Sequence, residues 1–148
     1  GMVAVTTDYC RWQDARQPSL IKVVSAFFFP SLVEEALWRG ILLSPNASIA
    51  QAVTLLSLHV LVHPVIGESG LWPRGRDTFR DPRFLLLATI VLGGATASYM
   101  VSGGSVYAAT LAHAVPLTLW RDVFGGEERL LGGENGDANR EPPQPTNQ

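Results

Sequence analysis

The sequence predicts an all-α membrane protein, a polytopic bundle of about four helices that form two helical hairpins. Charged residues are only 16% of the 148 residues, compared with roughly 25% in soluble proteins. No Asp, Glu, Lys or Arg occurs in residues 40–67 or in residues 84–120. A helix of a soluble protein rarely extends so far without charge, because one of its faces contacts water. The two uncharged stretches therefore favour a membrane protein over the alternative, a soluble four-helix bundle.

Turn-forming residues divide the apolar part of the chain into four segments of roughly the 20 residues that cross a bilayer. The first segment follows Ser19, a favourable N-cap, and contains Pro30, which predicts a kink or a division into two helices. The expected segments are residues 20–43, 47–66, 84–101 and 105–124. Turns at residues 44–46 and 102–104 close two hairpins, and residues 67–83, rich in Gly, Pro and Arg, form the loop between them.

Three parts are expected along the chain: a polar N-terminal tail (1–19), a helical membrane core (20–124) and a disordered C-terminal tail (125–148). With two hairpins, both tails and the loop lie on one side of the membrane. That side carries Arg11, Arg16, Lys22 and four loop arginines, whereas the opposite turns carry no charge. The positive-inside rule then predicts that the N- and C-termini are cytoplasmic.

The charge and cysteine content limit the possible partners. A formal net charge of −2 without a cluster of Lys and Arg argues against a nucleic-acid partner. The expected partner is membrane lipid. The single cysteine, Cys10, cannot form a disulfide within the chain.

Apart from tyrosines and from Lys22, Arg121 and Asp122 near the segment ends, six ionisable side chains lie within the apolar segments. They are Glu34, Glu35, Arg39, His59, His63 and His113. Exposure of such groups to lipid costs free energy, so we expect them to face a shared interior cavity. On a helix, Glu35 and Arg39 share a face and can pair, whereas Glu34 points about 100° away. The simpler alternative is a solvated ion pair on an ordinary amphipathic helix.

A carboxylate and two or three imidazoles in a small wet cavity suit amide hydrolysis through an activated water. The carboxylate can take a proton from water, and one imidazole can orient that water. Another imidazole can donate a hydrogen bond to the oxyanion that forms on the carbonyl. No Ser or Cys is placed as an evident nucleophile, so the pattern does not require an acyl-enzyme.

The sequence Glu34-Glu35-x-x-x-Arg39-Gly40 resembles the first signature of a protease family, and histidines follow it on two later apolar segments. This is the CAAX prenyl endopeptidase type II and bacteriocin-processing (CPBP) family, also called the abortive-infection family, of intramembrane glutamic proteases. Residues 102–113 resemble its late-histidine region. The resemblance covers residues 27–120. It implies a glutamate-dependent hydrolase, an endopeptidase that acts on membrane-associated peptides or on the tails of membrane proteins.

The resemblance also implies roles for individual residues. Glu34 resembles the water-activating base, and Glu35 and Arg39 resemble a supporting ion pair. His113 resembles the residue that binds the scissile carbonyl or its oxyanion.

The second family signature, Phe-x-x-x-His, fits at two positions. His59-x-x-x-His63 gives His63 as the functional imidazole, and the spacing from the glutamates and the following Pro64 favour this assignment. Leu55-x-x-x-His59 gives His59 instead. Because the two histidines are four residues apart, they share a helix face, and one cavity could use both.

Two other functions remain as alternatives. The family often has Asn or Asp four residues after its late histidine, where this chain has Leu117. An inactive membrane scaffold or binding protein of the same fold is therefore the first alternative. A zinc metalloprotease is less favoured because the His-Glu-x-x-His pattern is absent. Its ligands would be His59, His63, His113 and Glu34, whereas the favoured function needs no cofactor.

Overall fold

The computed structural model describes residues 17–131, and every regular element in this range is helical. The helices are α2 (Leu20–Ala26), α3 (Val33–Glu35), α4 (Ile49–Ser69), α5 (Arg76–Arg80), α6 (Pro82–Val101), α7 (Val106–Thr118) and α8 (Gly126–Leu131). Short π-helical or 3₁₀ elements extend or precede them at η2 (Phe27–Leu32), η3 (Ala36–Ile41), η4 (Pro73–Gly75) and η5 (Leu119–Val123). Residues 1–16 and 132–148, which include most of both predicted tails, lie outside the described range.

Two helices, α4 and α6, are long and apolar enough to cross a membrane, with mean hydropathies of 1.8 and 1.9. Within an apolar 18-residue stretch of each helix, only 11% of α4 and 33% of α6 is buried against the rest of the protein. The exposed apolar positions of α4 include Val53, Leu58, Leu61 and Val65. A soluble bundle would bury such side chains in its core. The fold is therefore a helical membrane bundle, as predicted.

The first predicted segment is interrupted at Phe29, next to Pro30. Ser19 caps α2 by accepting a hydrogen bond from the backbone N–H of Lys22, as expected. The backbone of Phe29 is extended (φ −142°, ψ 122°), and the helical path continues from Pro30 through α3 and η3 to Ile41. Proline disfavours the helical conformation of the residue before it. The predicted division of this segment is confirmed.

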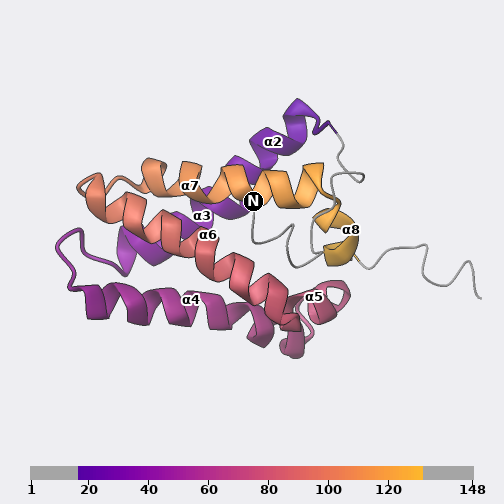
Figure 1. Ribbon diagram of the computed structural model, residues 1–148, viewed down its shortest axis with the longest axis horizontal. Coiled ribbons are helices and arrows are strands. Elements are labelled where there is room, and N and C mark those ends of the chain that lie inside the picture. The colour runs from indigo at the N-terminus through magenta and orange to yellow at the C-terminus, as the bar shows by residue number, and fades with distance from the viewer. Residues whose placement is uncertain (1–16, 132–148) are drawn as a thin grey trace, which may run out of the picture.

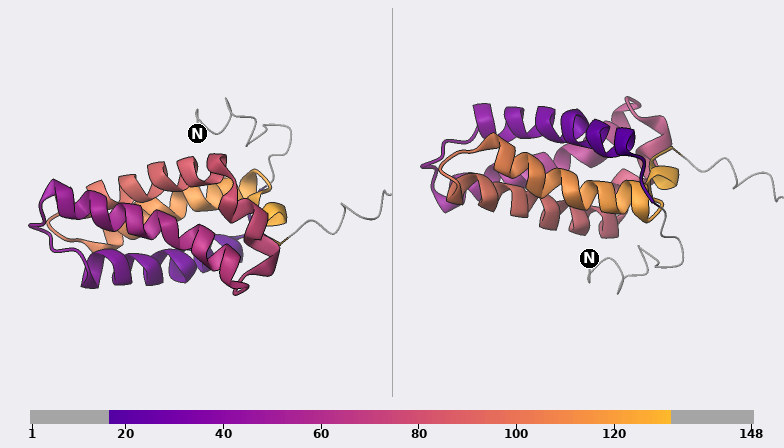
Figure 2. Two further views of the ribbon diagram at one scale, coloured as in Figure 1. Left: turned by 90° about the horizontal axis from the view of Figure 1, so that it is seen from below. Right: turned by 90° about the horizontal axis from the view of Figure 1, so that it is seen from above.

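The first segment and α4 form one of the two predicted hairpins, and α6 and α7 form the other (Figures 1 and 2). The turns that follow η3 and α6 lie at one end of the bundle, and α5 and α8 lie near each other at the other end. Ser48 caps α4 in a capping box with Gln51, and Ser105 caps α7. Helix α7 packs along α6 and also contacts α2, η2 and α3. It therefore covers the segment that carries the two adjacent glutamates.

The loop predicted at residues 67–83 is shorter than expected. Helix α4 continues through Pro64 to Ser69 and ends at Gly70, whose φ of 76° is left-handed. The loop also contains α5, whose Phe79 packs against Phe84 of α6. Apolar contacts between different helices stabilise these extra helical turns. The sequence of one segment alone does not reveal such contacts.

Helix α8 occupies the start of the tail that the sequence predicts to be disordered from residue 125. Its backbone oxygens at Arg129 and Leu130 accept hydrogen bonds from the side chains of Thr78 and Trp72. These contacts with the segment around α5 order residues whose composition alone indicates disorder.

Apolar packing surrounds the polar residues of the core on both sides. One cluster of buried side chains contains Phe79, Phe84, Ala88 and Trp120. The other contains Leu43, Ala52, Ala95, Tyr99 and Ala109. Along their helices, His59 of α4 and Leu92 of α6 lie between these clusters. The candidate functional residues therefore occupy the middle of the bundle.

Gly104, in the second hairpin turn, lies close to Pro45 in the first turn. Its replacement should therefore destabilise the fold more than replacement of Gly103. Both glycines have positive φ values, 97° and 71° respectively, which would cost an Ala about 1–2 kcal/mol. Only at Gly104 would a Cβ also lie 2.5 Å from Cγ of Pro45, an overlap that should cost about 1–3 kcal/mol more. Thermal unfolding of Gly104→Ala and Gly103→Ala in detergent micelles measures the difference. Equal midpoints would contradict a tight contact between the turns.

Candidate active site

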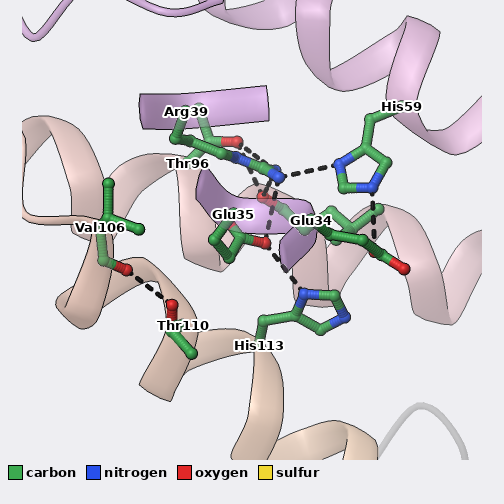
Figure 3. Close-up of polar contacts among 9 residues, drawn as sticks. Glu34, Glu35, Arg39, His59, Thr96, Val106, Thr110 and His113 are labelled. Carbon is green, nitrogen blue, oxygen red and sulfur yellow. Dashed lines mark hydrogen bonds and ion pairs between the residues drawn. The ribbon is translucent and has the colours of Figure 1, made fainter. Parts of the chain in front are cut away.

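The two adjacent glutamates of α3 contact different helices (Figure 3). The carboxylate of Glu35 is fully buried, and its Oε1 lies 2.9 Å from Nδ1 of His113 on α7. The side chain of Glu34 is 31% exposed, and its Oε2 lies 3.1 Å from Nε2 of His59 on α4. The rotation of about 100° between adjacent helix positions thus gives each carboxylate its own imidazole.

Arg39 connects the site to α3, α4 and α6 through its guanidinium. Nη1 donates to Oε1 of Glu35 at 3.1 Å and to Nδ1 of His59 at 2.8 Å. Nη2 donates to the backbone oxygen of Leu92 at 2.8 Å and to Oγ1 of Thr96 at 2.9 Å. The ion pair expected between Glu35 and Arg39 is present and buried. A buried guanidinium needs such a full set of acceptors to offset its desolvation.

The contacts of His59 determine which ring nitrogen carries its proton. A guanidinium has only donors, so Nδ1 of His59 must accept the hydrogen bond from Arg39. Nε2 then carries the hydrogen and donates it to Glu34. His59 is therefore a neutral imidazole that holds the Glu34 carboxylate in place. The indole of Trp38 stacks on this ring, with centroids 4.5 Å apart and planes inclined by 13°, and fixes the ring plane.

His113 and His63 line a cavity of about 50 Å³, large enough for a few water molecules. A carboxylate and a carbonyl oxygen only accept hydrogen bonds. Nδ1–H of His113 therefore donates to Glu35, and Nδ1–H of His63 donates to the backbone oxygen of Val60 at 3.2 Å. Because these bonds use Nδ1, the Nε2 atoms of His63 and His113 are available for other hydrogen-bond partners. Apolar side chains of α6, α7 and η5, including Leu117, complete the lining.

The structure brings five of the six candidate residues into one chain of hydrogen bonds. The chain runs Glu34, His59, Arg39, Glu35, His113. These five residues thus converge within the bundle, as the cost of exposing them to lipid requires. Of the six residues expected to face a shared cavity, only His63 and His113 line it.

His63, the histidine preferred from the sequence, does not belong to this chain of hydrogen bonds. Its ring lies 6.0 Å from that of His59 between centroids and packs edge-on against Phe79 and Phe84. The imidazole that contacts Glu34 is His59, the alternative assignment. The physical reason is helix length: because α4 extends to Ser69, His59 lies near its middle, opposite α3.

Some contributors to the site have no signal in the sequence. Thr96 and the backbone oxygen of Leu92 belong to a helix whose apolar stretch contains no Asp, Glu, Lys, Arg or His, and they reach Arg39 only through packing. Trp38 stacks on His59, and its position next to Arg39 could have indicated a place at the site. Within residues 17–131, no group of three His, Cys, Asp or Glu side chains is placed to hold a metal ion.

Residues 16–116 match the family model described as Type II CAAX prenyl endopeptidase Rce1-like. No curated protein and no solved structure matches the chain. The matched range contains every residue of the hydrogen-bond chain between Glu34 and His113.

Proposed function

Because the chain belongs to the Rce1-like family of type II CAAX prenyl endopeptidases, we propose that it is an intramembrane endopeptidase whose general base is Glu34. The observation that supports this proposal is the chain of hydrogen bonds from the partly exposed Glu34 to the buried His113 within a membrane bundle. Ionisable groups in such an apolar setting are costly, and they are typical of functional sites.

The proposed reaction is hydrolysis of an amide by an activated water. His59 holds one oxygen of the Glu34 carboxylate, which accepts a proton from the water as the water oxygen attacks the carbonyl carbon. His113, anchored by Glu35 through Nδ1, presents Nε2 to the substrate; when this nitrogen carries a proton, it donates to the oxyanion. The proton on Glu34 then passes to the amine nitrogen as the carbon–nitrogen bond breaks. No covalent intermediate and no cofactor are needed.

The proposed substrates are membrane-associated peptides or segments of membrane proteins, because the site lies in the middle of a bundle surrounded by lipid. We assign the end that contains α5 and α8 to the cytoplasm. Among the described residues, this end carries Lys22, Arg74, Arg76, Arg80 and Arg83, whereas the turns at the other end carry no charge.

Hydrolysis by the purified protein in lipid vesicles tests the function. The substrates are peptides tethered to the bilayer by an acyl chain or by a transmembrane helix, and mass spectrometry detects new peptide ends. We expect cleavage that persists after incubation with a metal chelator. Cleavage abolished by the chelator and restored by zinc would favour the metalloprotease alternative instead.

A catalytically inactive membrane scaffold is the second candidate function. Leu117, which stands where the family often has Asn or Asp, lines the cavity beside His113 and offers no hydrogen bond there. This candidate predicts that none of the tethered peptides is cleaved and that replacement of Glu34 leaves binding of membrane proteins unchanged.

Replacement of His59 should reduce hydrolysis more than replacement of His63. His59 both accepts from Arg39 and donates to Glu34, and Gln cannot reproduce both contacts at the ring positions. Loss of a hydrogen bond to a charged group, worth about 1.5–3 kcal/mol, corresponds to roughly a 10- to 100-fold lower kcat/KM for His59→Gln. The His63→Gln variant is the matched control from the same helix face. A larger loss for His63→Gln would restore the assignment favoured by the sequence.

A further inference from the structure

We propose that Thr96 is a positioning residue of this site, acting on the Glu34 carboxylate through Arg39 and His59. The proposal rests on the proposed function, because it assigns Thr96 a task in the same hydrolysis. Thr96 lies on α6, has no titratable group and has no part in the catalytic roles described above. Its hydroxyl nevertheless contacts the residue on which the hydrogen-bond chain depends.

The hydroxyl group of Thr96 has one orientation that satisfies its neighbours. Thr96 is buried, and its Oγ1 lies 2.9 Å from Nη2 of Arg39. Because a guanidinium only donates, Oγ1 must accept this bond, and its own hydrogen must point elsewhere. The backbone oxygen of Leu92, 2.8 Å away, receives that hydrogen. The same oxygen also accepts from Nη2, so Leu92 and Thr96 form a pair of fixed acceptors for one nitrogen.

Fixing Nη2 also fixes the other end of the planar guanidinium. Nη1 then points at Nδ1 of His59 and at Oε1 of Glu35. As long as Arg39 donates to Nδ1, the proton of His59 stays on Nε2 and holds Glu34. If the guanidinium rotates, Nδ1 can take the proton, and the lone pair of Nε2 then faces the Glu34 carboxylate. The acceptor pair on α6 thus controls the tautomer of His59 across the bundle.

Thr89 provides a matched control on the same helix. Its Oγ1 donates to the backbone oxygen of Leu85 at 2.7 Å, as Thr96 does to that of Leu92, but Thr89 is exposed. A Thr→Val change at either position removes a hydroxyl that bonds within α6. Only the change at Thr96 removes an acceptor from Arg39.

The kinetic test compares Thr96→Val, Thr96→Ser and Thr89→Val in lipid vesicles. We expect Thr96→Val to lower kcat by about 10- to 100-fold, the effect of losing a hydrogen bond to a charged group, with little change in KM. Thr96→Ser keeps the hydroxyl and should restore most of kcat. Thr89→Val should match the wild type. A wild-type kcat for Thr96→Val, or a loss that Thr96→Ser does not rescue, would overturn the proposal.

A spectroscopic test does not depend on hydrolysis. Nitrogen NMR of ¹⁵N-labelled histidine in detergent micelles distinguishes a protonated from an unprotonated ring nitrogen. We expect Nε2–H and a bare Nδ1 for His59 in the wild type and in Thr89→Val, and a mixture of tautomers in Thr96→Val. If the wild type cleaves no substrate while this tautomer shift is observed, the proposed function fails and the positioning role stands. An unchanged tautomer in Thr96→Val would overturn the positioning role, whatever its kcat.

Discussion

Replacement of Glu34 by Gln is expected to lower the rate of peptide hydrolysis by a factor of about 10² to 10⁴, the contribution of a positioned general base. Gln is the same size as Glu and can still accept the hydrogen bond from Nε2–H of His59. The fold and the site geometry should therefore persist, but an amide cannot take a proton from water. The loss should lie in kcat rather than KM, measured with a tethered peptide in lipid vesicles.

Glu68→Gln is the control for this experiment. Glu68 lies near the end of α4, is exposed and pairs with Arg76 and Arg80. Its replacement removes the same charge far from the site and should leave the rate unchanged. If Glu34→Gln cleaves as fast as the wild type, Glu34 is not the base, and the inactive-scaffold alternative or a different mechanism gains support.

Replacement of Arg39 by Met is expected to lower the free energy of unfolding by about 3–5 kcal/mol, the typical effect of breaking a buried ion pair. The side chain of Glu35 has no solvent exposure and would lose the cation that compensates its charge. The acceptors at His59, Leu92 and Thr96 would lose their donor at the same time. Reversible denaturation in mixed detergent micelles measures the change.

Two further variants separate charge burial from loss of side-chain volume. Arg76→Met breaks an exposed ion pair with Glu68 and should cost only about 0–1 kcal/mol. The double variant Glu35→Gln with Arg39→Met removes both buried charges and should recover part of the lost stability, because no carboxylate is left uncompensated. A double variant less stable than Arg39→Met would show that Glu35 contributes to stability through contacts other than this pair.

The fold was largely predictable because its main features depend on residues that are near each other in the sequence. Long uncharged stretches indicate membrane helices, Pro30 predicts the division at Phe29, and Ser19 indicates a helix start. The exceptions are α8 and the helical turns within the loop at 67–83. Contacts such as that of Trp72 with the backbone of Leu130 stabilise these turns, and they join distant parts of the chain.

By itself, the sequence determined that ionisable groups would gather inside a membrane bundle and that Glu35 would pair with Arg39, because the cost of lipid exposure and a four-residue spacing act locally. Only the tertiary structure decided that His59, rather than His63, contacts Glu34 and that Thr96 holds Arg39. Arg39 meets His59 across 20 positions and Thr96 across 57, and Glu35 meets His113 across 78. Such contacts depend on the rotation and depth of whole helices, which packing sets and no short motif encodes.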